Sequence, residues 1–178
     1  MITENEITRK TVRRVAEKMI LAARTAPKAR GTDNLILAIA EKEDIQEIAE
    51  KMKEIGQRIN AAFFLRDAEN IMQASCMLLA AAKINTMGLP YCGLCGFTDC
   101  DEKKKHPQTP CVFNTGDLGI AIGSAVSVAA NHRVDNRVMY TVGMAVKELG
   151  LLGGEAAVIY GIPLSATSKN PFFDRKQV

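Results

Sequence analysis

Four of the five cysteines in this 178-residue chain lie within one short stretch, and their spacing suits metal chemistry. The pattern is C-x2-C-x4-C-x10-C, and its thiols belong to Cys92, Cys95, Cys100 and Cys111. Four thiolates this close in sequence can ligate one metal centre. Gly93 and Gly96 flank the turn around Cys95 and permit unusual backbone angles there, so the first two sulfurs can be directed at the same point.

Three kinds of site could use this motif, and the sequence leaves all three open. We expect a [4Fe-4S] cluster, because the x4 gap and the glycine-rich frame resemble the four-cysteine motif of small iron–sulfur domains in electron-transfer complexes. A zinc ion also takes four thiolates, but zinc sites usually pair two C-x2-C knuckles, and only one is present. A redox-active dithiol, or a set of free thiols, is the third interpretation.

The expected function follows from the expected cluster. We predict an iron–sulfur protein of electron transfer or oxidoreduction, with a redox protein as its partner. The alternative is a non-enzymatic binding or regulatory protein braced by a structural zinc or iron–sulfur site. The run Lys103–His106 lies in the x10 gap and is either a solvated loop or an electrostatic dock for an acidic partner.

Length, composition and charge narrow the class of protein. The chain has the size of a single domain, residues 1–178, and its net charge of +3 does not demand a nucleic acid partner. The longest apolar run, Leu118–Ala130, is shorter than the roughly 20 residues of a membrane span. The first ten residues are charged rather than apolar, so we expect a cytoplasmic protein, in which thiols stay reduced. No catalytic triad, phosphate-binding Walker loop or G-x-G-x-x-G turn is evident in the sequence.

Hydrophobic periodicity predicts the elements that position the motif. Helices are expected over residues 4–24, 45–55, 67–85, 115–130 and 134–149. Strands are expected at Leu35–Ala40, Ala61–Leu65 and Ala156–Tyr160, and the tail from Gly161 is expected to wrap another surface. The cysteine-rich segment, 86–114, is too long for an ordinary connection and should be functional or organised by a metal. Cys76 falls in the third predicted helix, where we interpret it as a small core residue, with a reserve ligand or a reactive thiol as the alternative.

A second group of residues could hold a phosphate. The stretch L-A-A-R-T-A-P-K-A-R-G-T-D-N-L follows the first predicted helix and offers Arg24, Lys28 and Arg30. Arginine binds phosphate in a bidentate way and lysine by direct charge. The plainer interpretation is an exposed basic loop at a helix end. The tail K-N-P-F-F-D-R adds Arg175 beside two aromatic residues.

Together with the cysteine motif, these stretches resemble a prokaryotic family of ferredoxin-domain-containing proteins, and the resemblance covers nearly the whole chain. That family implies iron–sulfur binding. A more distant resemblance is to the nitroreductases, which are dimeric flavin enzymes: Ala23–Lys28 is similar to their flavin loop, and Asp117–Ala121 to a buried helix. The departures are Lys28, where a serine is expected, and Gly31–Leu35, which replaces an Asn-x-Gln-Pro-Trp sequence.

The nitroreductase resemblance implies a fold and a cofactor. The fold is α+β, with a mixed, mainly antiparallel sheet flanked by helices, into which the cysteine-rich segment is inserted. The cofactor is FMN, and the side chains that would contact its phosphate are Arg24, Lys28, Arg30 and Arg175. The resemblance also implies a homodimer built on long helices.

Overall fold

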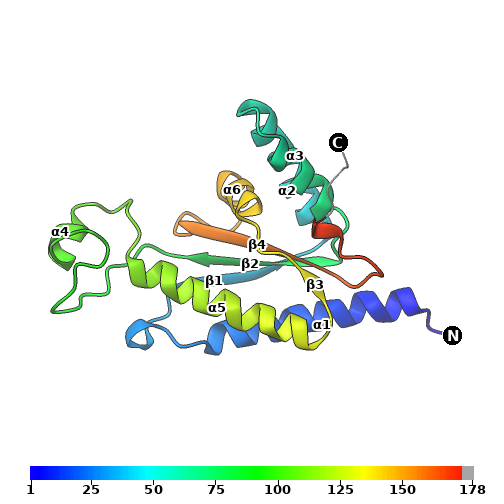
Figure 1. Cartoon of the computed structure of the whole chain (residues 1–178), viewed down its shortest axis with the longest axis horizontal. Helices are drawn as coiled ribbons and strands as arrows, with labels where there is room; N and C mark the ends of the chain where they lie inside the picture. The colour runs from blue at the N-terminus through cyan, green and yellow to red at the C-terminus, as the bar shows by residue number, and fades with distance from the viewer. Residues whose placement is uncertain (174–178) are drawn as a thin grey trace.

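A four-stranded antiparallel sheet forms the centre of the computed structural model, which describes residues 1–173 (Figure 1). The strands are β1 (Leu35–Ala40), β2 (Cys76–Ala82), β3 (Asp135–Asn136) and β4 (Val158–Ser165), in the order β1-β2-β4-β3. Every pairing between neighbouring strands is antiparallel. The α+β class and the mainly antiparallel sheet expected from the nitroreductase resemblance are therefore confirmed.

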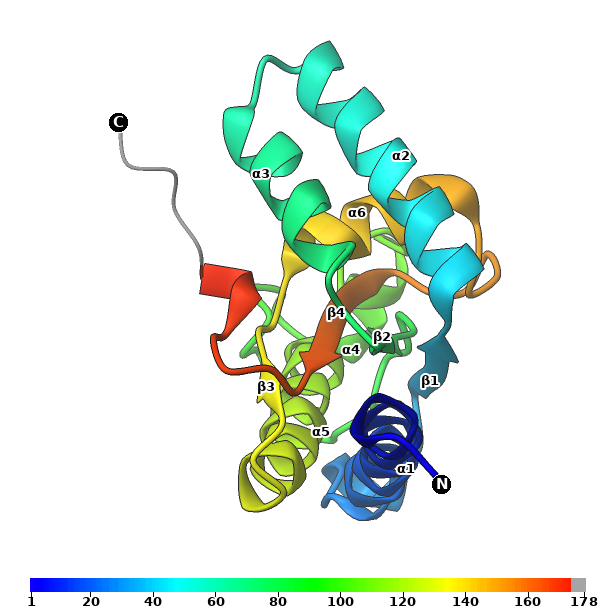
Figure 2. The ribbon, with the colours of Figure 1, turned by 90° about the vertical axis from the view of Figure 1, so that its right-hand side faces the viewer.

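Helices cover both faces of this sheet (Figure 2). One layer consists of α1 (Glu4–Thr25) and α5 (Val112–Asn131), and the other of α2 (Lys42–Arg58), α3 (Ala62–Ile71) and α6 (Tyr140–Leu149). The side chains of β2 alternate between the two cores: Leu78 packs on the α1–α5 side, and Met77 and Leu79 on the other. All seven residues of β2 are buried, since it lies between β1 and β4 and beneath both layers.

Two expectations about the middle of the chain were wrong. The predicted strand Ala61–Leu65 is the first half of α3, and the predicted helix over residues 67–85 ends at Ile71 and gives way to β2. The sequence of β2, CMLLAAA, consists of residues with high helix propensity and has no β-branched residue. Pairing with strands on both sides overrides that propensity, and a continuous apolar run does not distinguish a buried strand from a buried helix.

The C-terminal third also differs from expectation. The predicted helix over 134–149 begins only at Tyr140, because β3 precedes it. The predicted strand Ala156–Tyr160 is β4, which starts at Val158 and extends to Ser165. The start of the supposed polar tail is therefore a buried part of the sheet, paired with β2 across Met77–Pro163 and Cys76–Leu164.

Helix α5 begins directly after Cys111, the last cysteine of the motif, and packs in the core. By length and composition alone it could cross a membrane, and it is the one helix of residues 1–173 that could. It is longer than the apolar run seen in the sequence because it begins at Val112. In the fold it packs along α1 and over the sheet, and two polar residues, Asn114 and Asp117, are buried on its inner side.

The close packing of α6 on β4 depends on glycine. A Cβ atom added to Gly143 would lie 1.8 Å from the carbonyl oxygen of Ile159, and one added to Gly161 would lie 2.2 Å from a methyl carbon of Val142. The carbonyl oxygen of Ile159 belongs to the backbone of β4, so it cannot move away as a flexible side chain could. The two glycines therefore set the distance between the helix and the strand.

Substituting Gly143→Ala should destabilise the fold by about 3 kcal/mol, because overpacking outweighs the gain in helix propensity. Gly116→Ala in α5 is the matched control, since its added methyl group meets nothing within 4 Å. The control should be neutral or stabilising by up to about 1 kcal/mol. Urea unfolding followed by circular dichroism measures both, and equal stability of the two variants would contradict the described packing.

Candidate metal centre

The cysteine loop, residues 83–111, leaves the end of β2 and returns at the start of α5. It extends from one end of the molecule, away from the sheet and its helices (Figure 1). Along its course it forms one short helix, α4 (Cys100–Lys104). Its two ends lie close together because the N-terminus of α5 lies beside the end of β2, so the loop is closed at its base by the fold itself.

Three asparagine side chains, of which Asn34 and Asn114 are buried, join the two ends of the loop. The backbone N–H of Asn85 donates to the side-chain oxygen of Asn114 at 2.8 Å, and the Asn85 amide donates to that of Asn34 at 3.1 Å. The sulfur of Met87 lies 3.8 Å from the amide nitrogens of both Asn34 and Asn114. These contacts connect the start of β1, the exit of β2 and the first turn of α5.

Arg30 adds a further anchor. Its guanidinium group donates to the carbonyl of Met87 at 2.9 Å, and it reaches there from a left-handed backbone conformation with φ 55°. Such a conformation is uncommon for a residue with a side chain. Arg30 thereby fastens the cysteine loop to the segment that follows α1.

Beyond these anchors the loop has no apolar core of its own. From Gly88 to Pro110, all of which the structure describes, the one buried side chain is that of Lys103, which is 2% exposed. Polar and aromatic contacts give the loop its shape instead. The rings of Phe97 and His106 stack with centroids 4.8 Å apart.

The helix α4 is held by capping interactions. Asp99 accepts hydrogen bonds from the backbone N–H groups of Asp101 and Glu102. The hydroxyl and backbone N–H of Thr98 both donate to Glu102, and these bonds hold the pKa of Glu102 below its usual range. The turn that contains Cys100 is therefore ordered by local hydrogen bonds, without apolar burial.

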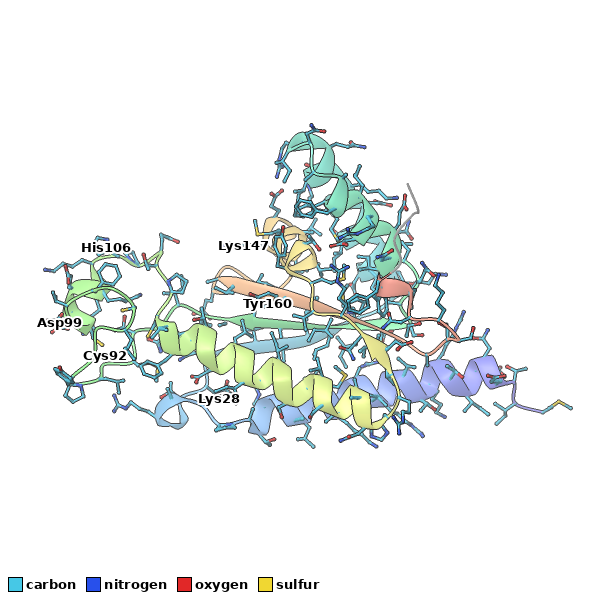
Figure 3. The ribbon with its side chains drawn as sticks, viewed as in Figure 1. Lys28, Cys92, Asp99, His106, Lys147 and Tyr160 are labelled. Atoms are coloured by element: carbon cyan, nitrogen blue, oxygen red, sulfur yellow. The ribbon has the colours of Figure 1, made fainter. Side chains whose placement is uncertain are left out.

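The four cysteines of the motif all lie on this loop (Figure 3). Cys92, Cys95 and Cys100 are half-buried, and Cys111 is buried at the N-cap position of α5. Among residues 1–173, no three histidine, cysteine, aspartate or glutamate side chains are close enough together to hold a metal ion. The four thiols thus lie on one loop, but in this structure they do not converge on a single position.

The surroundings of the thiols nevertheless suit an anionic cluster. Gly96 has φ 88°, an angle that a residue with a side chain rarely adopts, and its N–H donates to Gly93 at 2.9 Å in the turn between Cys92 and Cys95. Cys111 stands at the positive end of the α5 dipole. The first N–H groups of α5 have no acceptor within the described chain, so they are available to cluster sulfurs.

Lys103 brings a positive charge to the loop. The residue is 2% exposed, and its ammonium group has no acidic partner within residues 1–173. The one fully buried side-chain polar atom without a hydrogen bond in that range is the Ser165 hydroxyl oxygen, so the Lys103 nitrogen still reaches solvent. It is the aliphatic part of this lysine that is buried.

The predicted phosphate contacts have protein partners in this structure. Lys28 donates to three carbonyls, those of Ala23, Arg24 and Ala26, and so caps the end of α1 (Figure 3). Arg24 pairs with Asp33. Each arginine of this loop, Arg24 and Arg30, uses one guanidinium nitrogen for its described contacts and keeps others for a ligand. Arg175 lies outside the described residues, so its role stays a prediction.

Sequence reasoning named Asp117 only as part of a helix resemblance and missed its anchoring role, and it missed the three anchoring asparagines. Asp117 is buried, and both of its carboxylate oxygens lie 3.1 Å from the backbone nitrogen of Ala29, so it ties α5 to the loop after α1. An aspartate in the middle of an apolar helix was the available signal. The anchoring asparagines gave no such signal, because each lies next to a turn, where asparagine is common.

Comparisons with known proteins agree with these features. The profile of a family described as "Uncharacterized protein containing a ferredoxin domain (DUF2148)" matches residues 108–175, which include Cys111. A protein of Archaeoglobus fulgidus is 39% identical over 183 aligned positions, covering 98% of this chain and 97% of its own.

Three solved structures with a similar fold are described as nitroreductases or as a flavoprotein. A nitroreductase family protein from Clostridium novyi NT has a TM-score of 0.60 at 16% identity, covering 86% of this chain and 74% of its own. A nitroreductase with bound FMN from Desulfitobacterium hafniense DCB-2 has a TM-score of 0.56 at 14% identity, covering 99% and 85%. A BluB-like flavoprotein from Clostridium difficile 630 has a TM-score of 0.55 at 20% identity, covering 88% and 84%. At these identities the likeness shows a common fold.

The fifth cysteine behaves differently from the other four. Cys76 begins β2 rather than lying in a helix, and its interpretation as a small core residue is consistent with its 2% exposure. Burial raises the pKa of its thiol to about 11. Only the thiolate is a good nucleophile, so this thiol should be inert in the folded protein.

In metal-free protein at pH 8, iodoacetamide should modify Cys76 at least about 100-fold more slowly than Cys92, Cys95 and Cys100. Mass spectrometry of the digested protein measures the rate at each site. In denaturant all five thiols should react alike. Rapid modification of Cys76 in the native state would show that β2 is not enclosed as described.

Proposed function

Because this chain belongs to the family of ferredoxin-domain-containing proteins, we propose that its cysteine loop holds a [4Fe-4S] cluster and that the protein works in electron transfer or oxidoreduction. The ligands would be the four thiolates of the motif, from Cys92, Cys95, Cys100 and Cys111. When bound, such a cluster accepts and donates single electrons.

One observation carries this proposal. Four cysteines lie on a long loop that is anchored at its base and has no buried apolar side chain between Gly88 and Pro110. Long loops of this kind are uncommon in compact domains unless they have a function. A metal centre would supply the cross-links that apolar burial does not, since metal binding and local folding are coupled.

The charge on the loop supports a cluster over a bare set of thiols. Lys103 has no acidic partner in the described chain, and Cys111 lies at the positive end of α5. Both features stabilise negative charge beside them. They also favour the reduced cluster, which is more negative than the oxidised one.

We also propose a flavin as a second cofactor. The support is the fold neighbour described with bound FMN, together with the cationic loop after α1. Arg24 and Arg30 keep unused guanidinium nitrogens and would contact the phosphate, with Arg175 as a further candidate. Lys28 already donates to three carbonyls, so its part would be to hold the loop in shape.

The partners proposed are a second copy of the chain and a redox protein, in the cytoplasm. Exposed apolar side chains on the two long helices, Leu21 on α1 and Ile120 on α5, support the homodimer. Lys104 and Lys105 are exposed on the cysteine loop, and Tyr91 is 99% exposed there, which supports docking of an acidic partner. The homodimer is tested by light scattering of the purified protein, which measures its oligomeric state.

Anaerobically purified protein should contain about four irons per chain and show a broad visible charge-transfer band that dithionite bleaches. Cys95→Ser should lose most of this iron, because three thiolates cannot hold the cluster in the same way. Cys76→Ala is the matched control and should keep the full iron content, since Cys76 lies in the core, apart from the motif.

The same sample tests the alternatives. Flavin absorption beside the cluster band would support FMN. A colourless protein with about one zinc per chain would overturn the electron-transfer proposal and leave a structural four-cysteine site. Full iron content in Cys95→Ser would overturn the ligand assignment.

Lys103→Met should lower the reduction potential of the cluster by tens of millivolts, because it removes a positive charge from the loop that holds the ligands. Lys53→Met is the matched control: it removes the same charge from the exposed face of α2, away from the loop, where solvent screens it. Redox titration monitored by electron paramagnetic resonance measures both. Equal potentials in the two variants would show that Lys103 does not act on the cluster.

A further inference from the structure

A cavity of about 700 Å³ lies where the cysteine loop meets the end of the sheet, and the proposed cluster does not account for it. One wall is the last part of the loop, Pro107, Gln108 and Pro110. The opposite wall is Lys147 of α6 with residues 154–157 of the turn before β4. This volume is within the range of cavities that bind small molecules.

The lining of the cavity is mainly polar. It includes Asn34, which is 5% exposed, and Asn85 of the loop base. The side-chain nitrogen of Asn34 has one described contact, the sulfur of Met87 at 3.8 Å, which is a weak acceptor. Gln108 has no described side-chain partner. The cavity therefore offers buried and exposed amide groups to a hydrophilic ligand.

Its charges leave one cation in excess. Lys83 pairs with Glu155 at 2.6 Å across the rim. Burial alone would raise the pKa of Asp33, but hydrogen bonds from the Leu35 amide and from Arg24 outweigh it, so the pKa stays below its usual range and Asp33 stays ionised and paired.

Lys147 is the cation that no acid neutralises. Its ammonium group donates to the carbonyl of Ala157 at 3.1 Å and has no acidic partner within residues 1–173. An ammonium group has three donors, so two remain. Figure 3 shows Lys147 on the side of α6 that faces the cysteine loop.

We propose that this cavity binds a small hydrophilic molecule with a single carboxylate or phosphate group, which pairs with Lys147 while the amides of Asn34 and Gln108 bind its neutral polar groups. The site deepens the proposed function and rests on it in one respect: Pro110, which lines the cavity, directly precedes the proposed cluster ligand Cys111 in the chain, so a bound ligand would lie beside the loop that holds the cluster. The binding itself depends only on the cavity.

The test uses acetate and inorganic phosphate as probes on the purified full chain, at constant ionic strength set with potassium chloride. Isothermal titration calorimetry should show saturable binding of at least one of the two, and the preferred one identifies the anionic group. Lys147→Met should weaken that binding at least tenfold, whereas Lys147→Arg should retain most of it. Lys53→Met, an exposed lysine of α2 outside the cavity, is the control and should bind as the unmodified chain does.

A gain of binding provides an independent check. Glu155→Gln frees Lys83 from its ion pair and should tighten binding several-fold, because the cavity then holds two unpaired cations. No saturable binding of either anion, or unchanged binding in both Lys147→Met and Glu155→Gln, would overturn the site. Iron content measured on the same samples reports on the cluster separately, so the two proposals can fail independently.

Discussion

The amide contacts of Asn85 hold the functional end of the molecule together. They connect three segments that are distant in sequence: the start of β1 through Asn34, the exit of β2, and the first turn of α5 through Asn114. Asn85 is exposed, but its partners Asn34 and Asn114 are buried, and leaving either of these unpaired would cost about 1–3 kcal/mol. These bonds therefore hold the base of the cysteine loop, although the loop above it has no apolar core. The sheet and its helices therefore act as a platform that fixes where the loop begins and ends.

In the cysteine loop beyond this platform, polar and charged contacts replace the apolar burial that stabilises the rest of the fold. The loop carries one lysine, Lys103, without an acidic partner in the described residues, and it places Cys111 at the N-terminus of a 20-residue helix. Either feature alone has an ordinary structural explanation. Together with four thiols they favour negative charge, which is the charge that the proposed thiolate-ligated cluster would bring. In the same way, the cavity beside the loop base pairs two of its cationic neighbours with acids and leaves Lys147 for a ligand.

The parts of the structure that could be predicted from sequence are those set by local pattern. The periodicity of α1 placed that helix over residues 4–24, against Glu4–Thr25 in the structure, and the apolar run Leu35–Ala40 is β1. The identity of β2 was missed because its residues favour a helix and only its partners on both sides make it a strand. The cysteine motif was visible because its members are close in sequence. The anchors were not, because Asn34, Asn85 and Asn114 meet only after the chain has folded.

The loop after α1 connects the two proposed cofactors. Arg30 donates to the carbonyl of Met87 in the cysteine loop. Its other guanidinium nitrogens remain as hydrogen-bond donors, and a phosphate is an acceptor that arginine binds well. The backbone N–H of Ala29 donates to Asp117 of α5, the helix whose N-cap residue is Cys111. A phosphate bound at Arg30 would thus act on a residue that already fastens the cysteine loop, and ordering of either segment would lower the entropic cost of ordering the other. One arginine side chain and one buried aspartate therefore connect the loop proposed to bind flavin with the loop proposed to bind the cluster.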